Sequence, residues 1–247
     1  MKIKEYILRF CMRTGLVFML LLTTNGTANT EFHDVASTVM LNSLQTQSKN
    51  SFLRKLYTQL LFVPIWVKED SLSPLSGELL VLIKNDKTLS KSTKLYQDAV
   101  LLEQKAKEIY SNGTLYQKVD LEFKLSQLYK GYADYTLYGS INWGAFQDRL
   151  HNIKAEDISA GWVTHKPDIS PLKLVERAVF GEHLEKLFAQ AGPKEYRYKE
   201  LKSTLITYME LKNKGGWAYV PLEGILRVGK SSKHITALRE RLRVTGE

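Results

Sequence analysis

The chain has 247 residues, of which 44% are hydrophobic and 25% are charged. This composition is typical of globular proteins and excludes a collagen, a coiled coil and a wholly disordered chain. The only cysteine, Cys11, excludes an intrachain disulfide, a cysteine-based metal site and a Cys-x-x-Cys redox motif.

Residues 1–28 have the organisation of a secretory signal peptide. The basic start has a net charge of +3 from Lys2, Lys4, Arg9, Arg13 and Glu5. It is followed by an apolar run over residues 16–22 and then by the small residues Gly26-Thr27-Ala28, which form a predicted cleavage site. The run is shorter than the roughly 20 residues of a membrane span, so we expect membrane contact only if the leader is uncleaved.

The charge of the mature chain bears on its compartment and partners. Removing the leader lowers the net charge from +9 to +6. A basic, cysteine-free exported chain is typical of the bacterial periplasm, where anionic envelope polymers are available partners. We therefore predict a periplasmic protein and no nucleic-acid partner.

Helical spacing dominates the first half of the mature chain. Apolar residues three and four apart predict helices over 34–44 and 52–62, the second capped by Asn50 or Ser51, with a break at residues 63–66. A further helix is predicted from Ser73-Pro74, and another over 95–110 that stops at a left-handed Asn112-Gly113.

The second half continues in the same way. The strongest prediction is a helix over 115–138 that ends at Gly139; its apolar stripe is Leu121, Leu125, Leu128, Tyr132 and Tyr135. A short helix over 143–150, one from Ser170-Pro171 to Gly192, one over 195–213 and one over 231–244 follow. In the 195–213 helix, Leu201, Leu205, Tyr208 and Leu211 are expected to face inward. The aromatic and β-branched residues over 217–221 favour a strand or an ordered loop. The fold class is therefore mostly α, with one short extended segment.

The chain lacks the motifs of common catalytic and metal sites. Its five histidines are 14 or more residues apart, without metal-ligand spacing. Carboxylate pairs such as Glu176 with Glu182 have no special spacing. We predict no catalytic residue, no metal and no cofactor.

Five side chains are candidates for ligand binding. Three aromatic residues lie off the helical stripes and are free to contact a ligand: Trp162, Trp217 and Tyr219. Two arginines on the basic face of the last predicted helix could bind an anion: Arg239 and Arg241.

Three blocks of sequence resemble the long periplasmic murein L,D-transpeptidases. The first is a Pro-hydrophobic-Trp mark at Phe62-Val63-Pro64-Ile65-Trp66. The second is the helix that runs from Asp120-Leu121 through Leu128 and Tyr132-Ala133-Asp134 to Gly139. The third and most specific comprises Tyr198, Leu201, Leu205, Tyr208, Gly215-Gly216-Trp217, Pro221, Leu226, Gly229, Leu238-Arg239, Arg241-Leu242 and Thr245-Gly246.

The resemblance covers roughly residues 50–247 and implies a domain organisation. After the signal peptide predicted over 1–28, it implies a helical scaffold domain over 29–214. Over 215–247 it implies the start of a peptidoglycan-binding-like module, which is incomplete and ends in a terminal helix. The family's catalytic domain carries a His and a nucleophilic Cys in a Ser-x-Gly-Cys-x-Arg setting, and no cysteine follows Cys11 here. Because that acyl transfer needs a thiolate, the chain is predicted to be inactive alone.

Two functions follow as hypotheses. In the first, the chain is the non-catalytic scaffold portion of a cell-wall protein, from a truncated or split form, whose partner is peptidoglycan or the missing catalytic portion. In the second, it is an independent periplasmic helical adaptor. There, an exposed stripe of Ile235, Leu238 and Leu242 docks an envelope protein.

Overall fold

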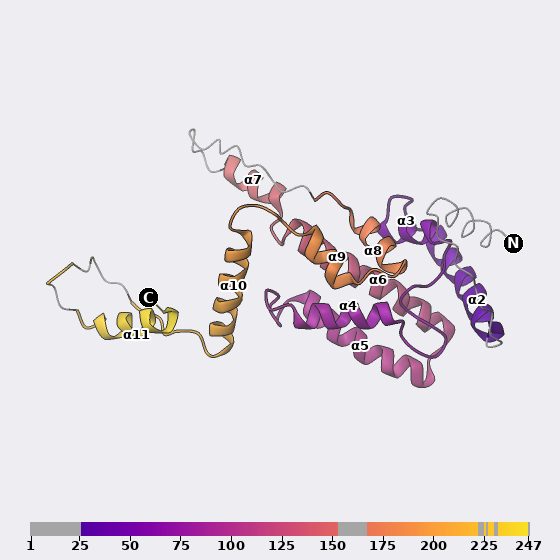
Figure 1. Cartoon of the computed structure of the whole chain (residues 1–247), viewed down its shortest axis with the longest axis horizontal. Helices are drawn as coiled ribbons and strands as arrows, with labels where there is room; N and C mark the ends of the chain where they lie inside the picture. The colour runs from indigo at the N-terminus through magenta and orange to yellow at the C-terminus, as the bar shows by residue number, and fades with distance from the viewer. Residues whose placement is uncertain (1–25, 153–166, 222–224, 226, 230–231, 247) are drawn as a thin grey trace. The chain divides into compact units, whose positions relative to one another are not determined.

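A computed structural model describes residues 26–152, 167–221, 225, 227–229 and 232–246 (Figure 1). The described residues contain ten helices and no strand beyond one isolated antiparallel bridge between Val67 and Leu72. The prediction of a mostly α protein is therefore confirmed.

The chain forms two compact units. The first comprises the described residues up to Lys84 together with Lys94–Gly192; the second comprises Asn85–Thr93 and the described residues from Pro193 onward. The predicted boundary between residues 214 and 215 stays a prediction. The helices are α2 (Gly26–Gln45), α3 (Phe52–Gln59), α4 (Pro74–Asn85), α5 (Lys94–Asn112), α6 (Leu115–Tyr138), α7 (Trp143–Asn152), α8 (Pro171–Val179), α9 (Leu184–Ala191), α10 (Tyr198–Asn213) and α11 (Ile235–Thr245).

Helix α6 is the centre of the first unit, and α2, α3, α5, α8 and α9 all pack against it. It begins with a capping box in which Thr114 and Gln117 bond each other's backbone N–H groups, and it ends at Gly139 with φ 78°. Leu121, Leu125, Leu128 and Tyr132 of the predicted stripe are buried, whereas Tyr135 is half-buried. The helix bounds and its core face are confirmed.

Serine side chains begin three helices of this unit. Ser51 accepts a hydrogen bond from Arg54 N, and Ser170 accepts one from Lys173 N before Pro171. Ser73 Oγ accepts a hydrogen bond from Ser76 N at 3.3 Å. The predicted caps are therefore confirmed, and Ser51 rather than Asn50 caps α3.

The predicted helix over 171–191 is two helices. Gly181 has φ 102°, a left-handed conformation that ends α8, and α9 begins at Leu184. His183 provides no side-chain cap for α9. Instead, Glu78 Oε2 of α4 accepts the Leu184 N–H at 3.0 Å. The prediction was wrong because apolar spacing continued across Gly181, while a distant carboxylate supplies the second N-terminal cap.

The inward-facing stripe predicted on α10 is also wrong, since this helix has no buried residue. Leu201 is 67% exposed and Leu205 is 47% exposed. Helical spacing identified the apolar face, but spacing cannot supply the second surface that would cover it.

Gly113 follows α5 for a different reason from the predicted one. It does not have positive φ; a Cβ there would clash with the carbonyl oxygen of Ile109 and lie 2.8 Å from Ile109 Cα. The close approach to backbone atoms therefore requires glycine.

Replacing Gly113 with alanine should lower the free energy of unfolding by about 1–3 kcal/mol, because the backbone must shift. Gly77, inside α4, is the matched control, since a Cβ there meets nothing within 4 Å. Gly77→Ala should raise stability by about 1 kcal/mol or less. Urea titrations of both variants measure this difference; equal effects of the same sign would contradict it.

In the part of the chain that the structure describes, no helix has both the length and the apolar character that a bilayer crossing requires. The predicted signal peptide falls almost entirely on residues 1–25, outside the described residues.

Candidate functional site

The second unit contains a groove of about 390 Å³ between the end of α10 and the turn that follows it. Tyr208, Met209 and Lys212 of α10 line the groove, and Gly215-Gly216-Trp217 close it. Its lining is therefore largely apolar, with one lysine.

The double glycine places Trp217 against α10. Gly215 and Gly216 have positive φ values of 110° and 65°, a backbone conformation that residues with a Cβ rarely adopt. Gly216 N donates to Leu211 O at 2.8 Å, so the chain turns back on the helix immediately after it ends. Trp217 then meets the ring of Tyr208 edge to face, with the ring centroids 5.8 Å apart.

Helix α11 supplies a cation to the same tryptophan. The guanidinium carbon of Arg241 lies 3.9 Å from the Trp217 ring centroid. This is close cation–π geometry, in which the planar guanidinium covers a ring face. The contact joins two residues that are both among the predicted ligand-binding candidates.

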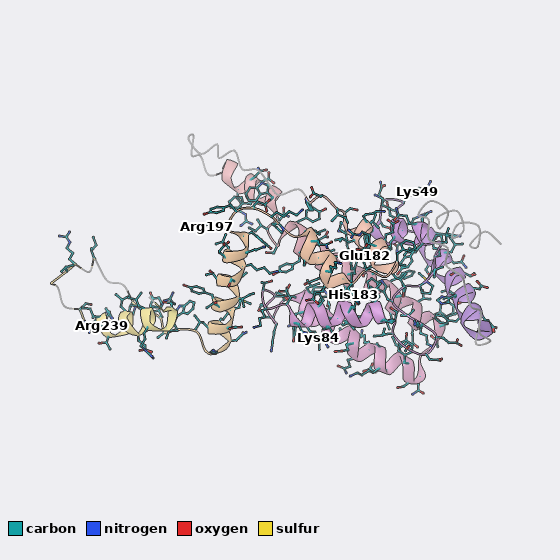
Figure 2. The ribbon with its side chains drawn as sticks, viewed as in Figure 1. Lys49, Lys84, Glu182, His183, Arg197 and Arg239 are labelled. Atoms are coloured by element: carbon teal, nitrogen blue, oxygen red, sulfur yellow. The ribbon has the colours of Figure 1, made fainter. Side chains whose placement is uncertain are left out.

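The other candidates lie elsewhere. Trp162 falls outside the described residues. Tyr219 is 85% exposed and does not line the groove. Arg239 is exposed on α11 (Figure 2). Because successive helix residues are about 100° apart, it lies on a different face from Arg241, so the expectation of one basic face that holds both arginines is wrong. Whether any of these residues binds a ligand stays a prediction.

Three groove residues, Tyr208, Met209 and Lys212, were not predicted as site residues. Tyr208 was assigned to a core stripe from its spacing. The signal that could have found the groove is the Gly-Gly turn, which returns Trp217 to the last turns of the helix.

The first unit holds a second polar cluster, around the carboxylate of Glu122, and this cluster is fully buried. Glu122 Oε1 accepts hydrogen bonds from Tyr57 Oη at 2.6 Å and from Ile65 N at 2.7 Å. Its Oε2 accepts from Trp66 N at 2.9 Å and Val67 N at 2.8 Å. One side chain of α6 thus fixes the backbone of the Pro-hydrophobic-Trp segment.

A serine one helical turn further along α6 extends the cluster. Trp66 Nε1 donates to Ser126 Oγ at 2.8 Å, and Ser126 Oγ lies 2.6 Å from Tyr57 Oη. Since the tyrosine proton is directed at Glu122, the serine hydroxyl donates to the tyrosine oxygen. The hydrogen bonds therefore run in one direction, from the indole through Ser126 and Tyr57 to the carboxylate.

Burial controls the protonation of this cluster. Desolvation raises the pKa of Glu122 to about 7, and the hydrogen bonds from Tyr57, Ile65, Val67 and Trp66 oppose this rise. Desolvation, together with the neighbouring Glu122, raises the pKa of Tyr57 well above its usual value. Because the cluster is closed to solvent, it can hold the segment over residues 65–67 in place but cannot reach a substrate.

Sequence reasoning missed Glu122, Ser126 and Tyr57. The available signal was the position of Glu122 and Ser126, four residues apart and each directly after a leucine of the α6 core stripe. Polar residues beside such a stripe are candidates for a buried network.

Glu176 and Glu182, considered above as a carboxylate pair, are each engaged in an ion pair. Glu176 pairs with Lys173 at 2.9 Å and Glu182 with Arg177 at 2.5 Å, so these two carboxylates face basic partners. Among the residues with defined placement, no group of three His, Cys, Asp or Glu side chains could hold a metal ion.

Comparison with known proteins gives one family. The model of the Scaffold domain family matches residues 51–205, which is more than half of the chain. Neither a curated protein nor a solved structure matches the sequence. The match spans the buried Glu122 cluster, the core of the first unit and the beginning of α10. The chain therefore belongs to the Scaffold domain family.

Proposed function

We propose that this chain is the non-catalytic scaffold portion of an L,D-transpeptidase-like protein of the bacterial cell wall, exported to the periplasm. The observation that carries the proposal is the Scaffold domain match over residues 51–205. It coincides with the first two blocks, and the beginning of the third, that resemble the long murein L,D-transpeptidases.

The chemistry of the chain supports a non-catalytic role. The resemblance implies that the family's reaction proceeds through a cysteine thiolate, and residues 12–247 contain no cysteine. The titratable group with a raised pKa near neutrality, Glu122, is enclosed in the core and holds a loop. The role that remains is to hold or position wall material, or the catalytic portion that acts on it.

The first test is co-sedimentation of the purified chain with isolated sacculi. We expect the mature chain to pellet with the sacculi, less so as salt increases, because the net charge is +6 once the predicted leader is removed. An Arg239→Gln, Arg241→Gln double variant should be retained less well than wild type. If neither the wild type nor the variant pellets with the sacculi, the result contradicts wall binding.

A muropeptide digest after the same incubation tests the absence of catalysis. We expect the same products with and without the chain. A new cross-linked product would contradict the assignment as a scaffold without catalytic activity.

A second candidate function is an adaptor for an envelope protein. The exposed apolar face of α10 favours it, since Leu201 and Leu205 lie open on a helix with no buried residue. The stripe of Ile235, Leu238 and Leu242 that the sequence suggested for docking is half-buried instead. For an adaptor, the chain stays in the supernatant of the sacculus experiment and pellets only when a wall-bound partner is added.

A further inference from the structure

Two cations at the Trp217 groove have no carboxylate partner among the residues that the structure describes. Lys212 lines the groove and Arg241 lies over the Trp217 ring. The acidic residues that precede them on the same helices are engaged elsewhere: Glu210 of α10 pairs with Lys87 at 2.8 Å, and Glu240 of α11 pairs with Arg243 at 2.6 Å. Within the described ranges, neither Lys212 nor Arg241 forms an ion pair, so the described part of the groove carries two positive charges that no described carboxylate pairs with.

The floor of the groove is suited to an apolar side chain. Tyr208, Met209 and Trp217 provide an aromatic and thioether surface around about 390 Å³. Methionine adapts its shape to different apolar partners. On the same helix, Leu205 and Leu201 continue the exposed apolar strip from Tyr208 toward the start of α10.

The arrangement around Trp217 disfavours a sugar. A sugar ring would stack on the indole face, but the Arg241 guanidinium already lies 3.9 Å from the ring centroid. Tyr208 packs against the same indole with the two rings at 87°. A guanidinium that lies over an aromatic ring can still direct N–H groups at a carboxylate.

We infer that the groove binds an acidic peptide segment of a partner protein, one that places a large apolar side chain against Tyr208, Met209 and Trp217. Its carboxylates pair with Lys212 and Arg241. Charge complementarity with these two cations selects an acidic segment, and the apolar strip on α10 gives it a surface to lie along. The inference concerns the groove alone and does not depend on a role in the cell wall.

The test is selection of a phage-displayed library of random dodecapeptides on the immobilised full chain. The expected peptides combine Asp or Glu with at least one Leu, Ile, Phe or Trp. A synthetic peptide of the enriched sequence should bind about tenfold more weakly to a Lys212→Gln, Arg241→Gln variant and to Trp217→Ala. Its affinity for the wild type should fall as salt increases.

Matched controls separate the groove from general charge and from misfolding. Lys107→Gln removes an exposed lysine of α5 in the first unit and should leave binding unchanged. Lys212 is exposed and Arg241 is half-buried, and neither belongs to a buried core, so the circular dichroism of the double glutamine variant should match wild type even if Trp217→Ala loses structure.

Several results would overturn the inference. They are enrichment without acidic residues, binding insensitive to the Lys212 and Arg241 substitutions, and competition by soluble muropeptides rather than by acidic peptides. Self-association of the chain through the groove, with loss of peptide binding, would overturn it as well. The peptide experiment uses no sacculi. A negative result in it therefore leaves the co-sedimentation result unaffected, and a negative co-sedimentation result leaves the peptide experiment unaffected.

Discussion

Replacing Glu122 with alanine is expected to lower the free energy of unfolding by on the order of 4 kcal/mol or more. The substitution removes the acceptor of Tyr57 Oη and of the N–H groups of Ile65, Trp66 and Val67, all within 2.9 Å of the carboxylate. It also leaves a cavity in the core. Urea titration followed by circular dichroism measures the loss.

The matched control for this substitution is Glu108→Ala. Glu108 lies exposed on α5, so its removal should change the stability by about 0.5 kcal/mol or less. If Glu122→Ala and Glu108→Ala unfold at the same urea concentration, the buried carboxylate does not hold the segment over residues 65–67.

The same residue should make stability depend on pH. Burial raises the pKa of Glu122 from 4.5 to about 7, so between these values the folded chain binds more protons than the unfolded chain. The stabilising contribution is therefore fully present below about pH 4.5 and is lost as the pH rises to about 7. The change is on the order of 3 kcal/mol.

Comparison with Glu122→Gln isolates this contribution from other titrating groups. The amide keeps the shape and one acceptor oxygen but cannot ionise, so the fall in stability between pH 4.5 and about 7 should be absent from this variant. The quantity to measure is the difference between the unfolding free energies of wild type and variant across that range. A difference that does not change with pH would show that the folded and unfolded pKa values are equal.

The second large effect is expected for Trp66→Ala, at about 3–5 kcal/mol. Trp66 is 0% exposed, and its ring centroid lies 5.6 Å from that of Tyr129. Its indole N–H also donates to Ser126. The substitution therefore removes core packing and one end of the hydrogen-bonded chain that leads to Glu122. Thermal unfolding of the two proteins gives the measurement.

Trp143→Ala is the control for the loss of a tryptophan. Trp143 is half-buried on α7 and stacks on Phe146, with ring centroids 5.2 Å apart, so its removal should cost less. A melting temperature that Trp66→Ala leaves unchanged would contradict the assignment of Trp66 to the core.

Local signals in the sequence were sufficient to find most helices and their ends. The spacing of Leu121, Leu125 and Leu128 identified α6, and Ser170-Pro171 and Gly139 marked helix boundaries correctly, because caps and apolar periodicity act within a few residues. Where a distant group decided the outcome, the same reasoning failed. The interruption at Gly181, where Glu78 caps α9, is the clearest example.

The candidate site was found only in part. Trp217 and Arg241 were selected as an aromatic residue and a basic residue outside the core stripes, but nothing local joined them. Their stacking requires the turn at Gly215-Gly216 and the return of α11, which only the folded second unit supplies.

The sequence by itself determined the helical class, the serine caps of α3, α4 and α8 and the absence of a thiol beyond Cys11, since each of these depends on residue type or on neighbours along one helix. Only the tertiary structure decided that Glu122 lies in the core beneath Trp66, and that the apolar face of α10 stays open. Burial and hydrogen bonding at these positions depend on tertiary contacts between distant parts of the chain, and a local sequence pattern does not specify those contacts.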